Sequence, residues 1–278
     1  MSGSGIISFA IIVINVIFSY NGFKNALFFE RYKFEVDKIL INKDYKRFVT
    51  SGFLHVSWQH LIFNMFSLYF FSGGIEYFTG SFQFLLIYLA SLIGGNLLSL
   101  VIHRNEGDYS SVGASGAVCG VIFASIALFP GMGINLIITI PGWLYGILFV
   151  LGSIYGIRSR RDNIGHDAHL GGALIGMLVA LVLHPDALFD NYVTILVIAA
   201  PCIFFIIMII TKPGFLLIDN PFFNKHNKNY TLDQRYNMDK IDKQKEIDRI
   251  LDKINRSGIK SLTPKEKQVL DEYSRISQ

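Results

Sequence analysis

A serine, two histidines and an asparagine lie inside strongly apolar stretches of this chain, where polar side chains are costly. Ser115 begins one such stretch, and His169 lies near the start of another. His60 and Asn64 are four residues apart in a third. Ionisable or strongly polar residues in apolar spans are candidate functional residues by default. A serine becomes an effective nucleophile only when a base takes its proton, and an imidazole can be that base.

The spacing of these residues places them at one depth in a membrane. From Ser115, His169 and His60 to the ends of their apolar stretches, the chain continues for about 14–16 residues, which is about 21–24 Å of helix at ~1.5 Å per residue. The hydrocarbon core is about 30 Å thick, so all three side chains lie roughly 6–9 Å below the same surface by this rise. A hydroxyl and two imidazoles at one depth predict a catalytic centre.

Each candidate residue has a chemical role. Ser115 is the predicted nucleophile and His169 the predicted base. Asp167 is the nearest acid in sequence, but at ~100° per residue it points about 200° away from His169 on a helix. We therefore predict a Ser–His dyad. His60 and Asn64 share one helix face, and with the backbone amide of Ser115 they can donate hydrogen bonds to an oxyanion.

Other residues support this centre. Gly113 and Gly116 flank the serine and permit a tight turn and the close approach of another helix. His55 and His166 are expected near the membrane interface in structural roles. The stretch after Ser115 is short for a span, so non-helical backbone must reach the serine at depth. Such backbone is tolerated only in protein or beside water, which predicts a water-filled cavity open on one face.

The composition is that of a membrane protein. Hydrophobic residues make up 51% of the 278 residues and charged residues 17%, below the usual ~25%. The net charge of +4 is modest and suggests no nucleic-acid partner. Two cysteines, Cys119 and Cys202, lie in apolar runs and are expected to be small apolar fillers rather than a disulfide framework.

The predicted fold class is all-α, a polytopic bundle of membrane helices. The apolar segments long enough, or nearly so, to span are 5–21, 55–77, 82–102, 115–129, 134–157, 166–184 and 192–211. We expect the first to be a retained helix, since no Lys or Arg precedes it and no clear cleavage site follows. A long connection, residues 22–54, mixes charged and aromatic residues and is expected to lie partly in the membrane interface.

Two domains are predicted, a membrane-embedded domain over 1–211 and a polar tail over 212–278. The tail is expected to form short amphipathic helices, one along Ile247, Ile250, Leu251 and Ile254 and another beginning at Thr263. Glu266 lies three residues after Thr263, which is the spacing of a capping box.

At these residues the chain resembles the rhomboid family of intramembrane serine proteases. His55, His60 and Asn64 have the spacing of the family's HxxxxHxxxN, Gly113–Gly116 matches GxSG, and Ala168–Gly172 resembles AHxxG. The stretch from Arg47 to His55 resembles the segment around the family's Trp-Arg pair, although Lys46 replaces the tryptophan. Cys119 stands where an aromatic residue often supports the base.

The resemblance implies a rhomboid-like six-helix core, extended here by a seventh transmembrane helix. It implies a nucleophile at Ser115, a base at His169 and an oxyanion site at His60 and Asn64. It implies single-span membrane proteins as substrates and the lipid bilayer as surroundings. We expect no cofactor and no metal. The implied location is a multi-pass protein of the bacterial inner membrane, with the active site opening away from the cytoplasm.

Two other functions remain open. One is a catalytically inactive rhomboid-like module that binds membrane proteins, against which both Ser115 and His169 argue. The other is a redox or metal protein using the paired histidines His55/His60 and His166/His169, although no HExxH motif is present. The loops on the face of the candidate site also carry all the loop Lys and Arg residues, which the positive-inside rule assigns to the cytoplasm, against the family analogy.

Overall fold

The computed structural model describes residues 5–135, 139–159 and 165–211, and in the tail residues 250, 253, 254, 262, 263, 266, 267, 269 and 270. The chain divides into two compact units, residues 1–221 and 222–278. The first unit is a helical bundle, as predicted. Its long helices are α1 (Ile6–Lys24), α5 (Trp58–Thr79), α6 (Ser81–Ile102), α7 (Ser115–Leu128), α8 (Gly142–Ser159), α9 (His166–Leu183) and α11 (Tyr192–Thr211).

Four of these helices have the length and composition of membrane spans. Among the described residues, α1, α6, α9 and α11 are long and apolar enough to cross a membrane. Helices α7 and α8 are shorter apolar helices. Helix α5 is as long as α6, with 22 residues, but carries polar side chains along its length, including His60, Asn64 and Glu76.

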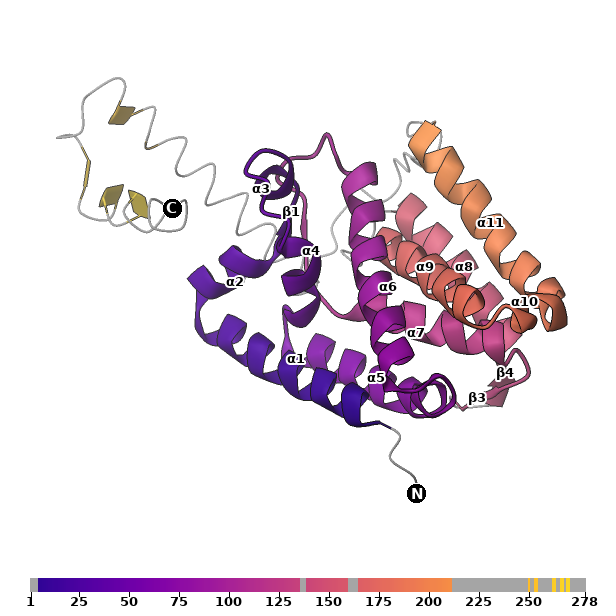
Figure 1. Cartoon of the computed structure of the whole chain (residues 1–278). Coiled ribbons are helices and arrows are strands. Elements are labelled where there is room, and N and C mark those ends of the chain that lie inside the picture. Colours follow the sequence, from indigo (N-terminus) through magenta and orange to yellow (C-terminus); the bar gives the residue numbers. More distant parts are fainter. Residues whose placement is uncertain are drawn as a thin grey trace. The chain divides into compact units, whose positions relative to one another are not determined.

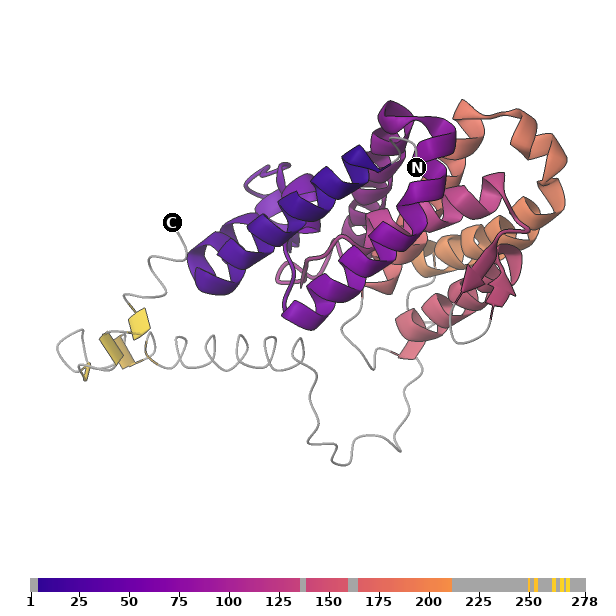
Figure 2. The same cartoon turned by 90° about the horizontal axis from the view of Figure 1, so that it is seen from below.

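Helix α7 lies in the middle of the bundle, with α5, α6 and α9 packed around it (Figures 1 and 2). Helix α1 packs on α5, and α11 packs on α8. The candidate serine at the start of α7 is therefore enclosed by neighbouring helices. A short segment, α10 (Asp186–Asp190), joins α9 to α11.

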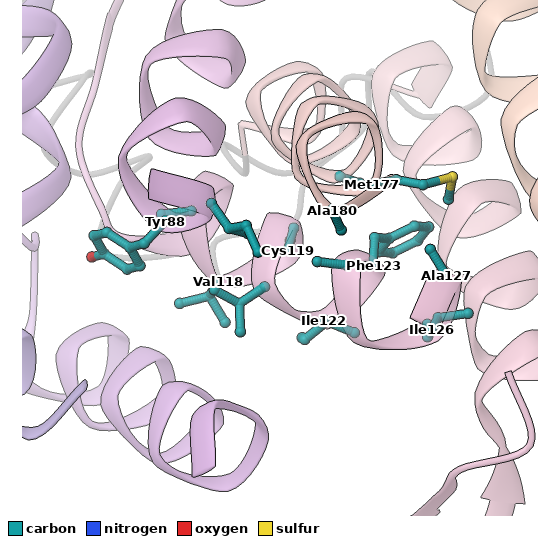
Figure 3. Close-up of a cluster of buried hydrophobic side chains, with 14 of the residues drawn as sticks. Tyr88, Val118, Cys119, Ile122, Phe123, Ile126, Ala127, Met177 and Ala180 are labelled. Atoms are coloured by element: carbon teal, nitrogen blue, oxygen red, sulfur yellow. The ribbon is translucent and has the colours of Figure 1, made fainter. Parts of the chain in front are cut away.

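The core is apolar and centred on α7. Almost every residue of this helix after Ser115 is buried, from Gly116 to Leu128. Phe123, Ile126 and Ala127 pack with Met177 and Ala180 of α9, as Figure 3 shows. Both cysteines are free and buried among these apolar residues, as the sequence predicts.

The outer surface of the bundle is also apolar. Exposed large hydrophobic residues cover α5 and α11 in particular, and they include Phe63, Phe66, Leu196, Phe204 and Ile207. Soluble monomers rarely expose apolar patches of this extent. A helix that is apolar on its outer face as well as its inner face is suited to lipid.

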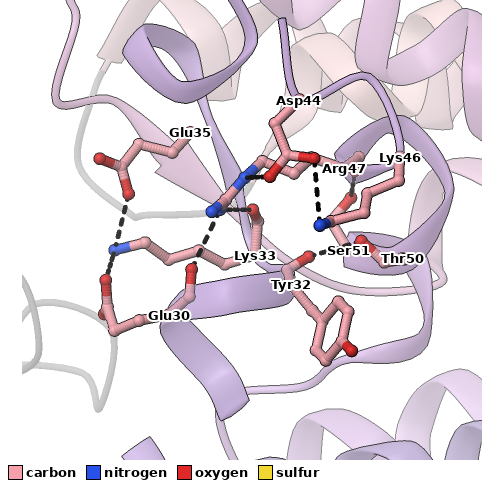
Figure 4. A network of polar contacts seen from close by, with 9 residues as sticks. All are labelled: Glu30, Tyr32, Lys33, Glu35, Asp44, Lys46, Arg47, Thr50 and Ser51. Carbon is pink, nitrogen blue, oxygen red and sulfur yellow. Dashed lines mark hydrogen bonds and ion pairs between the residues drawn. The ribbon is translucent and has the colours of Figure 1, made fainter. Parts of the chain in front are cut away.

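The connection from residue 25 to 57 is folded into short elements: α2 (Ala26–Tyr32), β1 (Phe34–Glu35), α3 (Val36–Leu40), α4 (Arg47–Thr50) and the 3-10 turn η1 (Ser51–Phe53). Arg47 is buried, and its guanidinium donates to the carbonyls of Glu30 and Lys33 and to the carboxylate of Asp44 (Figure 4). Lys46 pairs with Asp44 at 3.3 Å. One arginine thus ties the end of α2 to the turn before α4.

This connection also holds the segment that leads to Ser115. Strand β1 pairs with β2 (Ser110–Ser111), with Phe34 opposite Ser111 and Glu35 opposite Ser110. The amides of Val36 and Asp37 donate to the carbonyls of Tyr109 and Gly107. The non-helical approach to the serine is therefore fixed by backbone pairing.

Two predicted boundaries are wrong. The second apolar segment becomes helical only at Trp58, because Ser57 is extended and its hydroxyl accepts from the amide of His60; His55 therefore precedes the helix. The segment from residue 134 forms a hairpin of β3 (Gly133–Asn135) and β4 (Thr139–Pro141) before α8 begins at Gly142. Pro141 disfavours helical backbone at the residue before it.

The predicted capping box in the tail is present. The carboxylate of Glu266 accepts from the amide of Thr263 at 2.8 Å, and the Thr263 hydroxyl accepts from the amide of Glu266 at 3.3 Å. Lys253 also pairs with Glu266. The Lys253 ammonium and the Thr263 amide lower the pKa of Glu266 to about 2. Of the predicted stripe Ile247, Ile250, Leu251 and Ile254, the structure describes Ile250 and Ile254.

A second carboxylate caps α1. Glu76, near the end of α5, is buried and accepts from the amides of Ile7 and Ser8 at 3.0 and 3.1 Å. Its carboxylate also accepts from the hydroxyl of Ser81 at the start of α6. The first amides of a helix lack intrahelical partners, so Glu76 satisfies them and joins three helix ends.

Candidate active site

The predicted nucleophile and base are in direct contact. The Nε2 atom of His169 lies 2.7 Å from Oγ of Ser115, although the residues are 54 positions apart in sequence. Ser115 is the first residue of α7, and His169 lies in the first turn of α9. A hydroxyl and an imidazole at this distance can share a proton.

Glycines bring α7 and α9 together at their backbones. A Cβ on Gly172 would lie 2.0 Å from the carbonyl oxygen of Gly116, and a Cβ on Gly176 would lie 2.3 Å from that of Gly120. No side chain fits at such distances. The pairs are spaced four residues apart on each helix, which is the small-xxx-small pattern of close membrane packing. The dyad distance is therefore set by main-chain contact one turn further along.

Gly113 creates the space between the serine and His60. Its φ of 130° is disfavoured for residues that carry a Cβ. A Cβ there would lie 2.9 Å from Cε1 of His60, 3.0 Å from its Nε2, and 3.7 Å from Oγ of Ser115. The His60 ring and the serine hydroxyl thus border one small space, which the missing side chain leaves open.

His60 is half-buried beside this space and lacks a full set of partners. Within the described residues, its buried Nδ1 atom has no hydrogen-bond partner. The amide nitrogen of Asn64 donates to the carbonyl of His60 at 3.0 Å, within α5. The structure therefore brings His60 towards the serine, whereas the Asn64 amide uses one of its two N–H groups on its own helix.

His55 positions the turn before the serine. Its Nε2 accepts from the amide of Ala114 at 3.4 Å, and its Nδ1 lies 2.9 Å from the hydroxyl of Ser19. That hydroxyl donates to the carbonyl of Phe53. A neutral imidazole has one donor and one acceptor, so this arrangement requires the proton on Nδ1 of His55. The residue is a structural link between α1 and the approach to α7.

Two rings lie beside the predicted base, and the nearby acid faces elsewhere. His169 lies beside Phe149 of α8, at 6.2 Å between ring centroids, and beside His166 at 5.8 Å. Oδ2 of Asp167 lies 3.3 Å from Nε2 of His103, which agrees with the predicted opposite direction from His169. Sequence reasoning missed both Phe149 and His103. The position of His103 at the end of an apolar segment was the available signal.

The paired histidines lie ring against ring. Within the described part of the chain, no three His, Cys, Asp or Glu residues are grouped as metal ligands. His55 and His60 meet edge to face, with centroids 4.9 Å apart.

Comparison with known proteins decides the family. A family model of the rhomboid domain matches residues 42–186, more than half of the chain. The chain belongs to the rhomboid family. It is a multi-pass membrane protein with the helical bundle of that family. A second model, described as a family of unknown function (DUF6576), matches residues 230–276.

Rhomboid relatives occur in bacteria and in organelles. Rhomboid protease AarA of Providencia stuartii is 32% identical over 190 residues, which cover 59% of this chain and 65% of that protein. Rhomboid-like protein 11, chloroplastic, of Arabidopsis thaliana is 35% identical over 159 residues, 52% of this chain and 55% of the relative. RHOMBOID-like protein 12, mitochondrial, of Arabidopsis thaliana is 34% identical over 148 residues, which cover 47% of this chain and 44% of the relative. The chain spans about half the length of the curated relatives it matches.

Proposed function

We propose that this rhomboid-family chain is an intramembrane serine endopeptidase. Its substrates are membrane proteins, which it hydrolyses in or near a transmembrane segment. The observation that carries the proposal is the 2.7 Å contact between Oγ of Ser115 and Nε2 of His169. The similarity to the rhomboid protease of Providencia stuartii supports the same activity.

The chemistry follows from this contact. Oγ of Ser115 attacks the scissile carbonyl carbon while its proton passes to Nε2 of His169. The imidazolium then gives that proton to the leaving amine, and an acyl-enzyme remains on Ser115. Water, deprotonated by the same imidazole, hydrolyses the ester and restores the serine. No carboxylate is required, since Asp167 is directed away from the base.

The oxyanion requires hydrogen-bond donors near the serine. The first amides of α7, including that of Ser115, have no partner within their helix. The space beside Gly113 lies between the His60 ring and the serine hydroxyl, so an oxyanion there meets donors from two helices. Asn64, with its second N–H group, is the third candidate donor. Such donors are worth roughly 10²–10³ in turnover each.

Two measurements test the proposal. A fluorophosphonate probe should label the purified protein, and Ser115→Ala should abolish both the labelling and the cleavage of a single-span model substrate. Ser125→Ala is a matched control, because Ser125 lies on the same helix and its hydroxyl donates to the carbonyl of Val121. Cleavage that persists in a protease-free Ser115→Ala sample would rule out the dyad.

The competing function is a rhomboid-like module that binds membrane proteins without cutting them. It predicts that the substrate co-purifies with the protein and that neither the wild type nor Ser115→Ala reacts with the probe. The short Ser115–His169 contact favours the protease, because a binding module needs no proton acceptor at the serine.

A further inference from the structure

His103, a histidine outside the proposed dyad, lies between two carboxylates at the end of α6. Nε2 of His103 is 3.3 Å from Oδ2 of Asp167, and Nδ1 is 2.7 Å from Oε2 of Glu106. The ring stacks on Tyr109, with centroids 3.6 Å apart and planes 5° from parallel. Asp167 is 5% exposed and the His103 side chain 15%. We call these four residues the His103 cluster.

The cluster joins the elements that carry the dyad. His103 ends α6, while Glu106 and Tyr109 belong to the connection that leads to Ser115. Asp167 lies in the first turn of α9, two residues before His169. The carbonyl of the intervening Ala168 lies where a Cβ on Gly95 or Gly116 would collide with it. The first turn of α9 is thus held on one side by glycine contacts and on the other by Asp167.

The other charged groups nearby do not replace this link. Asp37 of α3 has its carboxylate against Gly107 of the same connection. Arg104 is exposed. His166 directs its ring towards Gly156 of α8 and stands beside His169. Asp167 and Glu106 are therefore the carboxylates that face His103.

The protonation state of His103 determines whether it forms ion pairs with both carboxylates. An imidazolium has two N–H donors, whereas a neutral imidazole has one. Burial lowers the pKa of His103, but the carboxylates of Asp167 and Glu106 outweigh burial and raise the pKa above its ordinary value of 6.5. When the proton leaves, the ring loses its positive charge, and the 3.3 Å ion pair with Asp167 is lost with it.

We propose that Asp167 is a positioning residue for the base, holding the first turn of α9 through protonated His103 so that His169 meets Ser115. The effect on catalysis rests on the proposed protease function, whereas the link itself does not. At low pH, the imidazolium of His103 pairs with both carboxylates, and the first turn of α9 is fixed. At high pH, the neutral ring no longer forms the ion pair with Asp167, the first turn of α9 loosens, and the distance from base to serine is less well defined.

The link is tested first without reference to catalysis. A group with a raised pKa contributes stability that is complete below the unfolded pKa and is lost as the pH rises through the folded pKa. In detergent micelles at about pH 6, Asp167→Asn should therefore have a lower melting temperature than the wild type. This difference in melting temperature, called the gap below, should close as the pH rises above ~6.5. Arg104→Gln, which changes an exposed charge beside His103, should show no pH-dependent gap. A gap for Asp167→Asn that is constant with pH overturns the link.

The second test measures kcat and KM against pH with a single-span substrate. The wild type should lose kcat on the alkaline side as His103 deprotonates. His103→Gln should lack this alkaline loss and have a kcat lowered roughly tenfold to a hundredfold, the scale of an ångström-sized misplacement, with KM little changed. Asp167→Asn should lack this loss as well, because the ion pair that deprotonation of His103 breaks is already absent in that variant.

The outcomes separate the two proposals. If the wild type neither cleaves the substrate nor reacts with a fluorophosphonate, the protease proposal fails. The melting temperatures still decide whether the His103–Asp167 link exists. If the wild type cleaves and His103→Gln keeps the same alkaline limb, Asp167 has no positioning role and the present inference is overturned.

Discussion

Gly113 is constrained at the residue scale by its backbone angle and by its neighbours. Gly113→Ala places a Cβ at a φ of 130° and 2.9 Å from the His60 ring. Strain of this kind costs about 1–3 kcal/mol, and the methyl group fills the space proposed for the oxyanion. We expect turnover to fall by roughly 10²–10³, as for a lost oxyanion donor.

The control for this substitution is Gly73→Ala in α5, where no heavy atom lies within 4 Å of the new Cβ. It should keep full activity, measured by cleavage of the same substrate under the same conditions. A Gly113→Ala enzyme with unchanged turnover would show that the space beside the serine is not used in the reaction.

His60 and Asn64 differ in how directly they reach the serine. Replacing either with Ala should lower turnover by up to roughly 10²–10³ while leaving some fluorophosphonate labelling. The loss should be larger for His60→Ala, because its ring borders the space beside Ser115 while the Asn64 amide donates to its own helix. Rate constants for both variants, with melting temperatures as the folding check, decide the order. Full turnover in both would make these residues packing elements.

At the scale of elements, the α7–α9 contact should tolerate no added side chain. Gly176→Val brings carbon atoms onto the carbonyl of Gly120, which a Cβ would approach to 2.3 Å. Overpacking of this kind costs about 1–3 kcal/mol, or more where backbone must move. The melting temperature and the activity should fall together, because the same contact sets the Ser115–His169 distance.

Gly152→Val in α8 is the matched control, since its Cβ would meet nothing within 4 Å. It should change neither the melting temperature nor kcat appreciably. If Gly176→Val keeps wild-type activity, the two helices do not set the geometry of the dyad.

The elements that sequence alone predicted are those with long apolar patterns. Helices α6, α7, α9 and α11 begin and end within a residue or two of expectation, because apolar length and flanking polar residues mark such spans. The hairpin of β3 and β4 was missed, since a short apolar run looks the same whether it is strand or helix. The start of α5 was placed before its actual N-cap at Ser57.

Contacts between distant residues were less accessible from sequence. The depth argument placed Ser115 and His169 at one level, and the structure adds their 2.7 Å contact. The partner of Asp167 could not be found from its own helix, because a helical wheel gives a direction and not the identity of the neighbour. Likewise, no pattern indicates that a buried Arg47 would bind the carbonyls of Glu30 and Lys33.

At the scale of the whole molecule, the side of the membrane to which the site opens is a prediction. The basic residues on the face of the site are Lys24, Arg31, Lys33, Lys38, Lys43, Lys46, Arg47, Arg104, Arg158, Arg160 and Arg161. The last two lie outside the described residues. Insertion bias assigns this face to the cytoplasm, whereas the family analogy assigns it to the outside. Buried pairing weakens the bias, since Lys33 and Arg47 are bound within the folded connection.

We predict that this face is extracytoplasmic in a bacterial inner membrane. Alkaline phosphatase, which is active only outside the cytoplasm, should be active when fused after Arg161 and inactive when fused after Gly131. Expression of both fusions is checked by immunoblot. The reverse pattern would mean that insertion bias determines the topology and that substrates are drawn from the cytoplasmic face.

The Glu76 cap has a consequence for the order of assembly. The amides of Ile7 and Ser8 are synthesised before their acceptor, which lies 69 and 68 residues later in the chain. Chains fold as they emerge, amino terminus first. Helix α1 therefore enters the bilayer before its cap exists, and its first turn is completed only when α5 has arrived and Ser81 has begun α6. Helix α1 is thus synthesised before α5 and α6, but its first turn is fixed only after both have begun to form.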